Sequence, residues 1–226
     1  HSIRRRQRQM CIRDRSLAAV GVVTAFLSML IWVLGQSRSA ISSIVSQYVG
    51  ANKINEVKDL PIQAIAIILL ISTVVCVITY PFSRSIFSLY NASGLLLDYS
   101  VSYYKIRVIG LPFTLYVFAV FGVFRGLQNT YYPMIIAITG ATVNILLDFI
   151  LVYGIKDWFL PLNLQGAAIA SVLSQLLMAV LATYFLLKKT EIPLRYSMPF
   201  NKEIPKFLNM IGHLIIRTLA CLLYTS

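Results

Sequence analysis

The 226-residue sequence is 58% hydrophobic and only 12% charged, with a mean hydropathy of +0.76. A soluble globular domain needs more polar side chains than this to cover its surface, so the composition excludes that class of protein. It predicts an all-α fold, a membrane helix bundle with several bilayer-spanning helices. The formal net charge of +12 therefore needs an explanation that fits a membrane protein.

The two ends of the chain differ from the rest. Residues 1–15 (HSIRRRQRQMCIRDR) and 221–226 (CLLYTS) resemble translated sequencing-adapter read-through, so we treat both segments as non-native and exclude them from fold reasoning. The first segment holds six arginines and one aspartate, and without it the formal charge falls from +12 to +7. The alternative is a native basic arm that binds anionic lipid beside the membrane.

Apolar runs of about 20 residues, the length that a helix needs to cross hydrocarbon, recur along the chain. The run from Pro61 to Pro81 is the clearest, because it contains no charge and has a proline at each end. The first run continues as helix to Val49, through small residues whose spacing suits close helix contacts or the wall of a cavity. The predicted spans are 17–36, 61–81, 108–124, 133–153 and 166–187, and a sixth begins near Phe207.

The connecting loops carry a strong charge bias. When the loops are assigned to alternate sides of the membrane, one side receives eight basic residues and the other receives two. Because positively charged loops stay in the cytoplasm, segments 50–60, 125–132 and 188–206 are predicted to be cytoplasmic parts of a multi-pass protein of the cell membrane. This topology accounts for the positive charge, and no nucleic-acid partner is needed. The eight are Lys53, Lys58, Arg125, Lys188, Lys189, Arg195, Lys202 and Lys206, and the two are Arg84 and Lys156.

A long, basic segment with three prolines divides the chain. We predict that residues 16–187 form one transmembrane bundle and that 188–206 is a cytoplasmic linker between two lobes. Residues 207–220 would then begin the first helix of a second lobe. This division predicts an incomplete polypeptide, because the final apolar run stops inside what should be a helix.

Asp148 is the acidic residue that lies inside a predicted span. At about 1.5 Å per residue it lies roughly two-thirds of the way across from Pro133, in the outer half of the membrane. Asn144, four residues earlier, shares its helical face. A charge at the bilayer centre costs about 2.5 to 3.5 kcal/mol, so we expect a functional reason, and this pair suits a proton or a sodium ion. The alternative is a structural ion pair with Arg38, Lys105, Arg107 or Arg217.

Several motifs in one order resemble the multidrug and toxic compound extrusion (MATE) family. FRGLQNTYYPM (124–134), GATVNILLDFILVYG (140–154) and QGAAIASVLSQ (165–175) match the order and spacing of that family's fourth to sixth helices. SIVSQYVGA (43–51) resembles the end of its second helix, and IIRTLA (215–220) resembles the start of the seventh in the DNA-damage-inducible (DinF-like) branch. The resemblance covers about residues 16–220. One departure is Tyr131, where the family often has a basic residue.

The resemblance implies a secondary antiporter that expels organic cations or drugs in exchange for H⁺ or Na⁺. The chain would hold roughly helices 2 to 6 of the amino-terminal lobe and the start of helix 7, without the first helix and the carboxy-terminal lobe. Asn144 and Asp148 match the coupling-ion site of the fifth helix, and Ser171 and Tyr103 match cavity-lining residues of the sixth and fourth helices. The expected partners are an organic cation, the lipid bilayer and the missing lobe. No enzymatic activity, cofactor or metal other than Na⁺ is expected.

Three other functions stay open. A lipid-linked precursor flippase of the same superfamily would line its cavity with several basic residues, for which Arg38, Lys105 and Arg107 are the candidates. A membrane enzyme has little support, because His213 is the only histidine after residue 15 and the predicted spans contain no paired carboxylates. The third possibility is a non-catalytic membrane subunit, and only Asp148 and Asn144 inside a predicted span argue against it.

Overall fold

The computed structural model describes residues 2–57, 59–154, 163–190 and 201–225. The secondary structure in these ranges is helical throughout, which confirms the predicted fold class. Most of it consists of α-helices, with two short 3-10 helices between them. The helices are α1 (Ser2–Leu34), α2 (Ser37–Gly50), η1 (Ile54–Val57), α3 (Leu60–Leu89), α4 (Leu95–Arg107), η2 (Val108–Gly110), α5 (Leu111–Gly126), α6 (Tyr131–Tyr153), α7 (Asn163–Lys189) and α8 (Ile204–Thr225).

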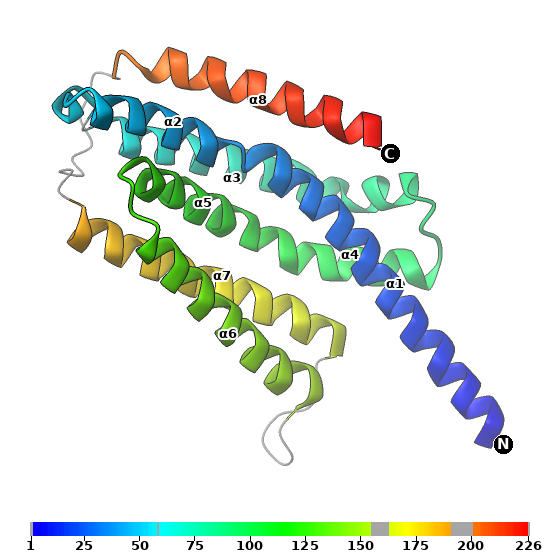
Figure 1. The fold of residues 1–226 in the computed structure, drawn as a ribbon. Helices are drawn as coiled ribbons and strands as arrows, with labels where there is room; N and C mark the ends of the chain where they lie inside the picture. The colour runs from blue at the N-terminus through cyan, green and yellow to red at the C-terminus, as the bar shows by residue number, and fades with distance from the viewer. Residues whose placement is uncertain (1, 58, 155–162, 191–200, 226) are drawn as a thin grey trace.

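Among the described residues, five helical segments are long and apolar enough to cross a membrane, which confirms the predicted number of complete spans. They pack side by side as one bundle (Figure 1). Two of them consist of two helices each: α1 and α2 meet at Gly35 and Gln36, and α4 and α5 are joined by η2. The spans are Ser16–Gly50, Leu60–Leu89, Leu95–Gly126, Tyr131–Val152 and Asn163–Lys189.

Two predicted boundaries are wrong. Pro81 does not end the second span, because α3 continues through it to Leu89. A proline inside a membrane helix is tolerated where neighbouring groups satisfy the backbone carbonyl that it leaves free. The third span begins at Leu95 rather than at residue 108, since α4 precedes η2. Lys105 and Arg107 interrupt the apolar pattern of α4, so the sequence hides this part of the span.

The central helix of the bundle is α5. It lies between α2 and α3 on one side and α7 on the other (Figure 1), and most of its side chains are buried. Two glycines let α2 approach it closely. A Cβ at Gly122 would lie 2.6 Å from the backbone oxygen of Arg38, and one at Gly126 would lie 2.6 Å from Cβ of Val45. The small-residue stretch of α2 therefore makes the close helix contact that its spacing predicted.

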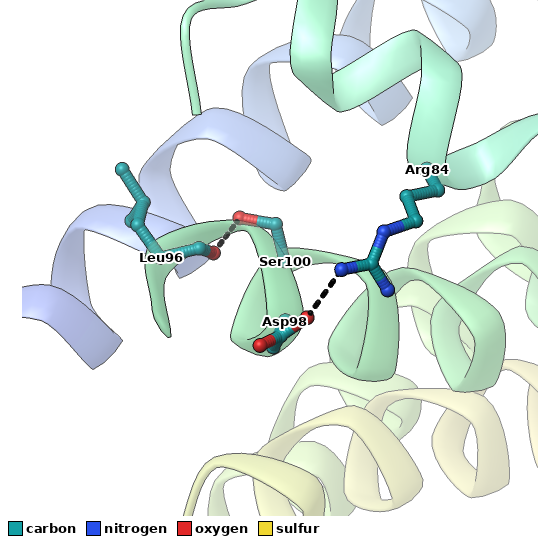
Figure 2. A network of polar contacts seen from close by, with 4 residues as sticks. All are labelled: Arg84, Leu96, Asp98 and Ser100. Atoms are coloured by element: carbon teal, nitrogen blue, oxygen red, sulfur yellow. Dashed lines mark hydrogen bonds and ion pairs between the residues drawn. The ribbon is translucent and has the colours of Figure 1, made fainter. Parts of the chain in front are cut away.

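An exposed ion pair joins α3 to the start of α4. Arg84 Nη2 lies 3.1 Å from Asp98 Oδ1, and in the same turn Ser100 Oγ donates a hydrogen bond to the Leu96 carbonyl (Figure 2). Asp98 also lies in the first turn of α4, where a carboxylate is favoured by the helix dipole. Both charged side chains are more than half exposed, so the pair is expected to add at most about 1 kcal/mol.

Asn201 fixes the start of α8 to the rest of the bundle. Its backbone N–H donates to Oε1 of Gln63 at 2.8 Å, and its side-chain Nδ2 donates to the Glu56 carbonyl at 2.9 Å. Its Oδ1 accepts a hydrogen bond from the Glu203 backbone N–H at 3.0 Å. Gln63 is only 2% exposed, so the contact lies inside the protein. The helix begins at Ile204, three residues before the predicted Phe207.

The predicted cytoplasmic connections gather at one end of the bundle. The segments between α2 and α3 and between α5 and α6 lie at the end where α7 finishes and α8 begins (Figure 1). This is the arrangement that alternate crossing requires, and it agrees with a multi-pass membrane protein. Residues 191–200 of the predicted linker lie outside the described residues. The proposed division into domains, including the non-native ends, stays a prediction.

Candidate functional site

Asn144 and Asp148 lie one turn apart on α6, as the sequence predicted, and both side chains are half-buried. The amide nitrogen of Asn144 and Oδ1 of Asp148 are fully shielded from solvent and have no hydrogen-bond partner in the described structure. Buried polar atoms are nearly always paired in folded proteins. Two unpaired atoms on one helical face therefore make this a candidate place for a ligand, an ion or water.

A cavity of about 350 Å³ lies beside Asn144, between α5, α6 and α7. Its polar lining consists of hydroxyl and amide groups and one guanidinium, and its apolar lining includes Phe118 and Phe121. The volume falls in the range of small-molecule pockets, roughly 300 to 1,000 Å³. The lining residues are Arg107, Thr114, Val117, Phe118, Phe121, Ala137, Gly140, Ala141, Asn144, Ser171, Ser174, Gln175 and Met178.

Arg107 is the cation of this site. Its side chain lines the cavity, and its Nε is buried without a hydrogen-bond partner. The ion pairs of the described residues do not include one between Arg107 and Asp148. The described structure therefore gives no support to the alternative of a structural ion pair between Arg107 and Asp148.

Gln175 of α7 holds Arg107 at the wall of the cavity. In the amide orientation that satisfies its neighbours, Gln175 accepts hydrogen bonds from Thr114 Oγ1 at 3.1 Å and from Nη1 of Arg107 at 3.3 Å. Its amide nitrogen donates to the Gly110 carbonyl at 3.3 Å. A Cβ at Gly110 would overlap the end of the Gln175 side chain, so a larger residue there would displace this amide from its position against Arg107.

Ser171 lines the same cavity as Asn144, whereas Tyr103 does not. The Ser171 hydroxyl donates to the Ala167 carbonyl at 3.0 Å, which leaves its oxygen free to accept a bond or to contact a cation. Tyr103 is buried in a separate apolar cluster with Phe87 and Tyr104. The structure therefore brings three of the four predicted residues to one region, namely Ser171, Asn144 and its neighbour Asp148, and leaves Tyr103 in the packing of α4.

Sequence reasoning assigned no role to Thr114 or Gln175, and it named Arg107 as a possible partner of Asp148 and as a candidate basic cavity residue of the flippase alternative. The sequence signal that could have identified Gln175 is its spacing from Ser171. Ser171 and Gln175 are four residues apart on α7, as Asn144 and Asp148 are on α6. Which helix faces which depends on tertiary packing, so the sequence alone does not bring the two pairs together. No three His, Cys, Asp or Glu side chains gather into a metal site within the described ranges.

Comparison with known proteins gives a consistent family signal. The sequence pattern of the MatE family matches residues 11–150, more than half of the chain. The multidrug export protein MepA of Staphylococcus haemolyticus is 29% identical over 138 residues, which cover 61% of this chain and 28% of MepA. The probable multidrug resistance protein NorM of Thermotoga maritima is 26% identical over 189 residues, which cover 81% of this chain and 39% of NorM.

The fold also matches solved structures. A crystal structure of a MATE protein in the bent conformation has a TM-score of 0.83 to this chain at 22% identity, over 91% of this chain and 46% of the other. At that level of identity the likeness establishes the helical architecture alone. The chain spans well under two thirds of the length of each of these relatives, about half in the structure and between 28% and 39% in MepA and NorM.

Proposed function

Because the chain belongs to the MatE family of membrane transporters, we propose that it forms the amino-terminal lobe of an antiporter that exports organic cations in exchange for H⁺ or Na⁺. In this proposal a second, carboxy-terminal lobe of the same polypeptide completes the transport pathway. The segment 215–220 supports a place in the DinF-like branch of the family. Members of the family are transporters rather than enzymes and are driven by ion gradients.

The observation that carries the proposal is the buried, unpaired Oδ1 of Asp148 on a membrane-spanning helix. A carboxylate oxygen held away from water attracts a proton, a sodium ion or an organic cation, and these three compete for it. Exchange follows when the coupling ion and the cargo favour different conformations of the protein. Two ligands with equal affinity for both conformations would leave the equilibrium between the conformations unchanged.

The other groups of the cavity have roles in the same proposal. The oxygen of Ser171 offers a second contact to a hard cation, and a half-turn of the Asn144 amide would present its oxygen as a third. Arg107 repels an entering cation and so prevents the carboxylate from holding it too tightly for release. The aromatic rings of Phe118 and Phe121 provide apolar contacts for the body of a lipophilic cargo.

The test is Asp148→Asn in the polypeptide that contains both lobes, reconstituted in vesicles with an imposed proton or sodium gradient. We expect the variant to lose gradient-driven export of ethidium, because its amide neither ionises nor attracts a cation. Asp98→Asn is the matched control, since it removes an exposed carboxylate at the outer end of α4. Export that is unchanged in Asp148→Asn at equal protein level would refute the coupling role.

A further inference from the structure

A second arginine lies within a membrane-spanning segment. Arg38 is the second residue of α2, just after the turn at Gly35 and Gln36. It precedes the end of α2 at Gly50 by twelve residues, or about 18 Å at 1.5 Å per residue, and it lies inside the apolar segment Ser16–Gly50. A charge inside a membrane-spanning helix is costly, so it is expected to have a partner.

The described structure offers Arg38 no counter-charge. Its Nε is shielded from solvent and makes no hydrogen bond, and none of the described ion pairs includes it. Arg125 of α5, three residues after the Gly122 that contacts Arg38, has the same sign. A partly buried cation with another cation nearby and no acid among the cavity-lining residues creates a positive potential that an anion would relieve.

Packing holds the guanidinium in one place. Its carbon atom lies 5.2 Å from the centroid of the Phe118 ring, within the range of a cation-π contact. The same ring packs against Gly35, where an added Cβ would lie 3.0 Å from it. The backbone of Arg38 is held against Gly122, one turn further along α5. A preformed guanidinium loses little conformational entropy when it binds, which favours recognition of a ligand.

A cavity of about 360 Å³ opens beside this guanidinium, and it combines polar and apolar walls. We propose that it binds the phosphate or carboxylate group of an amphipathic anion. The planar guanidinium matches the two oxygens of such a group, while the indole of Trp32 and the side chain of Ile31 contact its apolar body. Its lining residues are Ile31, Trp32, Gly35, Gln36, Arg38, Ser39 and Phe118.

This anion site is distinct from the cavity beside Asn144, although Phe118 forms part of the wall of both. The inference extends the chemistry of the cargo beyond organic cations, and it does not depend on the coupling role of Asp148. Its test measures binding rather than transport. A failure of one proposal therefore leaves the other standing.

The experiment uses the intrinsic fluorescence of Trp32. The sequence contains two tryptophans, so Trp158→Phe leaves Trp32 as the single reporter. The chain is placed in phosphatidylcholine nanodiscs and titrated with 12-bromododecyl phosphate, whose bromine quenches the indole. A trimethylammonium compound with the same brominated chain is the comparison probe. We expect saturable quenching by the phosphate and only weak, non-saturating quenching by the ammonium compound.

Two variants test the arginine. Arg38→Gln should weaken binding of the phosphate by about tenfold or more, because a charged hydrogen bond is lost. Arg38→Lys should retain part of the affinity, since it keeps the charge but not the planar fork. The matched control is Lys105→Gln, which removes a cation that lies 5.4 Å from the Tyr80 ring centroid on the exposed side of α4. Circular dichroism confirms that each variant keeps its helices.

Nanodiscs that also contain phosphatidylglycerol separate two sources of the anion. Competition by this lipid identifies an anionic lipid head group as the ligand, and its absence identifies a free amphipathic anion. Either outcome with an Arg38-dependent phosphate signal supports the site. Equal quenching by the two brominated probes, or unchanged phosphate affinity in a folded Arg38→Gln variant, would overturn it.

Discussion

The glycine contact between α2 and α5 makes a quantitative prediction about stability. In Gly122→Ala the new Cβ would lie 2.6 Å from the Arg38 carbonyl oxygen, 3.2 Å from Arg38 Cα and 3.2 Å from Cβ of Ile41. The first two atoms belong to the backbone, so no side-chain rotation relieves the contact. The two helices must separate, and we expect the free energy of unfolding to fall.

Two opposing terms set the size of this effect. Overpacking in a well-packed core typically costs about 1 to 3 kcal/mol. Replacing glycine with alanine in a helix gains up to about 1 kcal/mol through backbone entropy. Gly21→Ala should show only the gain in backbone entropy, because a Cβ at Gly21 of α1 meets nothing within 4 Å. The difference between the two variants should therefore equal the steric term, about 1 to 3 kcal/mol in favour of Gly21→Ala.

The measurement is reversible unfolding in mixed micelles, with the denaturing detergent as the variable and circular dichroism as the signal. Both variants are compared with the parent chain under the same conditions. We expect Gly21→Ala to be neutral or slightly stabilising and Gly122→Ala to be destabilising. If the two variants unfold at the same detergent fraction, α2 and α5 do not approach each other as closely as described.

Two further predictions concern charged side chains. Arg107→Gln should tighten binding of ethidium by about fivefold, or roughly 1 kcal/mol, because a cation that repels the ligand is removed from the wall of the cavity. Fluorescence titration of the reconstituted protein measures this, and weaker binding would contradict the repulsion. Arg84→Gln and Asp98→Asn, combined in a double-mutant cycle of unfolding free energies, should give a coupling below about 1 kcal/mol, since the pair is exposed. A coupling of several kcal/mol would show that the pair is shielded from water.

Hydropathy predicted most of the fold, and its two errors have physical causes. The spans at α6 and α7 contain long apolar runs, so their positions follow directly from the sequence. Pro81 was interpreted as a boundary because it breaks helices in water, but α3 continues through it to Leu89. The start of the third span was missed because the charges of Lys105 and Arg107 lower the apolar signal of α4.

The candidate site was only partly predictable. Helical periodicity places Asn144 and Asp148 on one face of α6 from the sequence alone. The role of Gln175 depends on how α7 packs against η2 and α5, which spacing within a single helix does not specify. Tyr103, in contrast, was predicted to line the cavity and does not. Its helix contributes Arg107 to the cavity, but Tyr103 itself lies in the apolar cluster around Phe87.

The hydrogen bonds of Asn201 to Gln63 and to the Glu56 carbonyl restrict how α8 moves. Because these bonds hold the segment just before α8, we expect any displacement of the helix to be a rotation about this point rather than a slide along its neighbours. From Ile204 to Ala220, where the excluded end begins, α8 extends about 25 Å, so a swing of about 10° would displace the far end by roughly 4 Å while the base stays almost still. Small angular changes at the base of α8 would thereby become larger displacements of its far end.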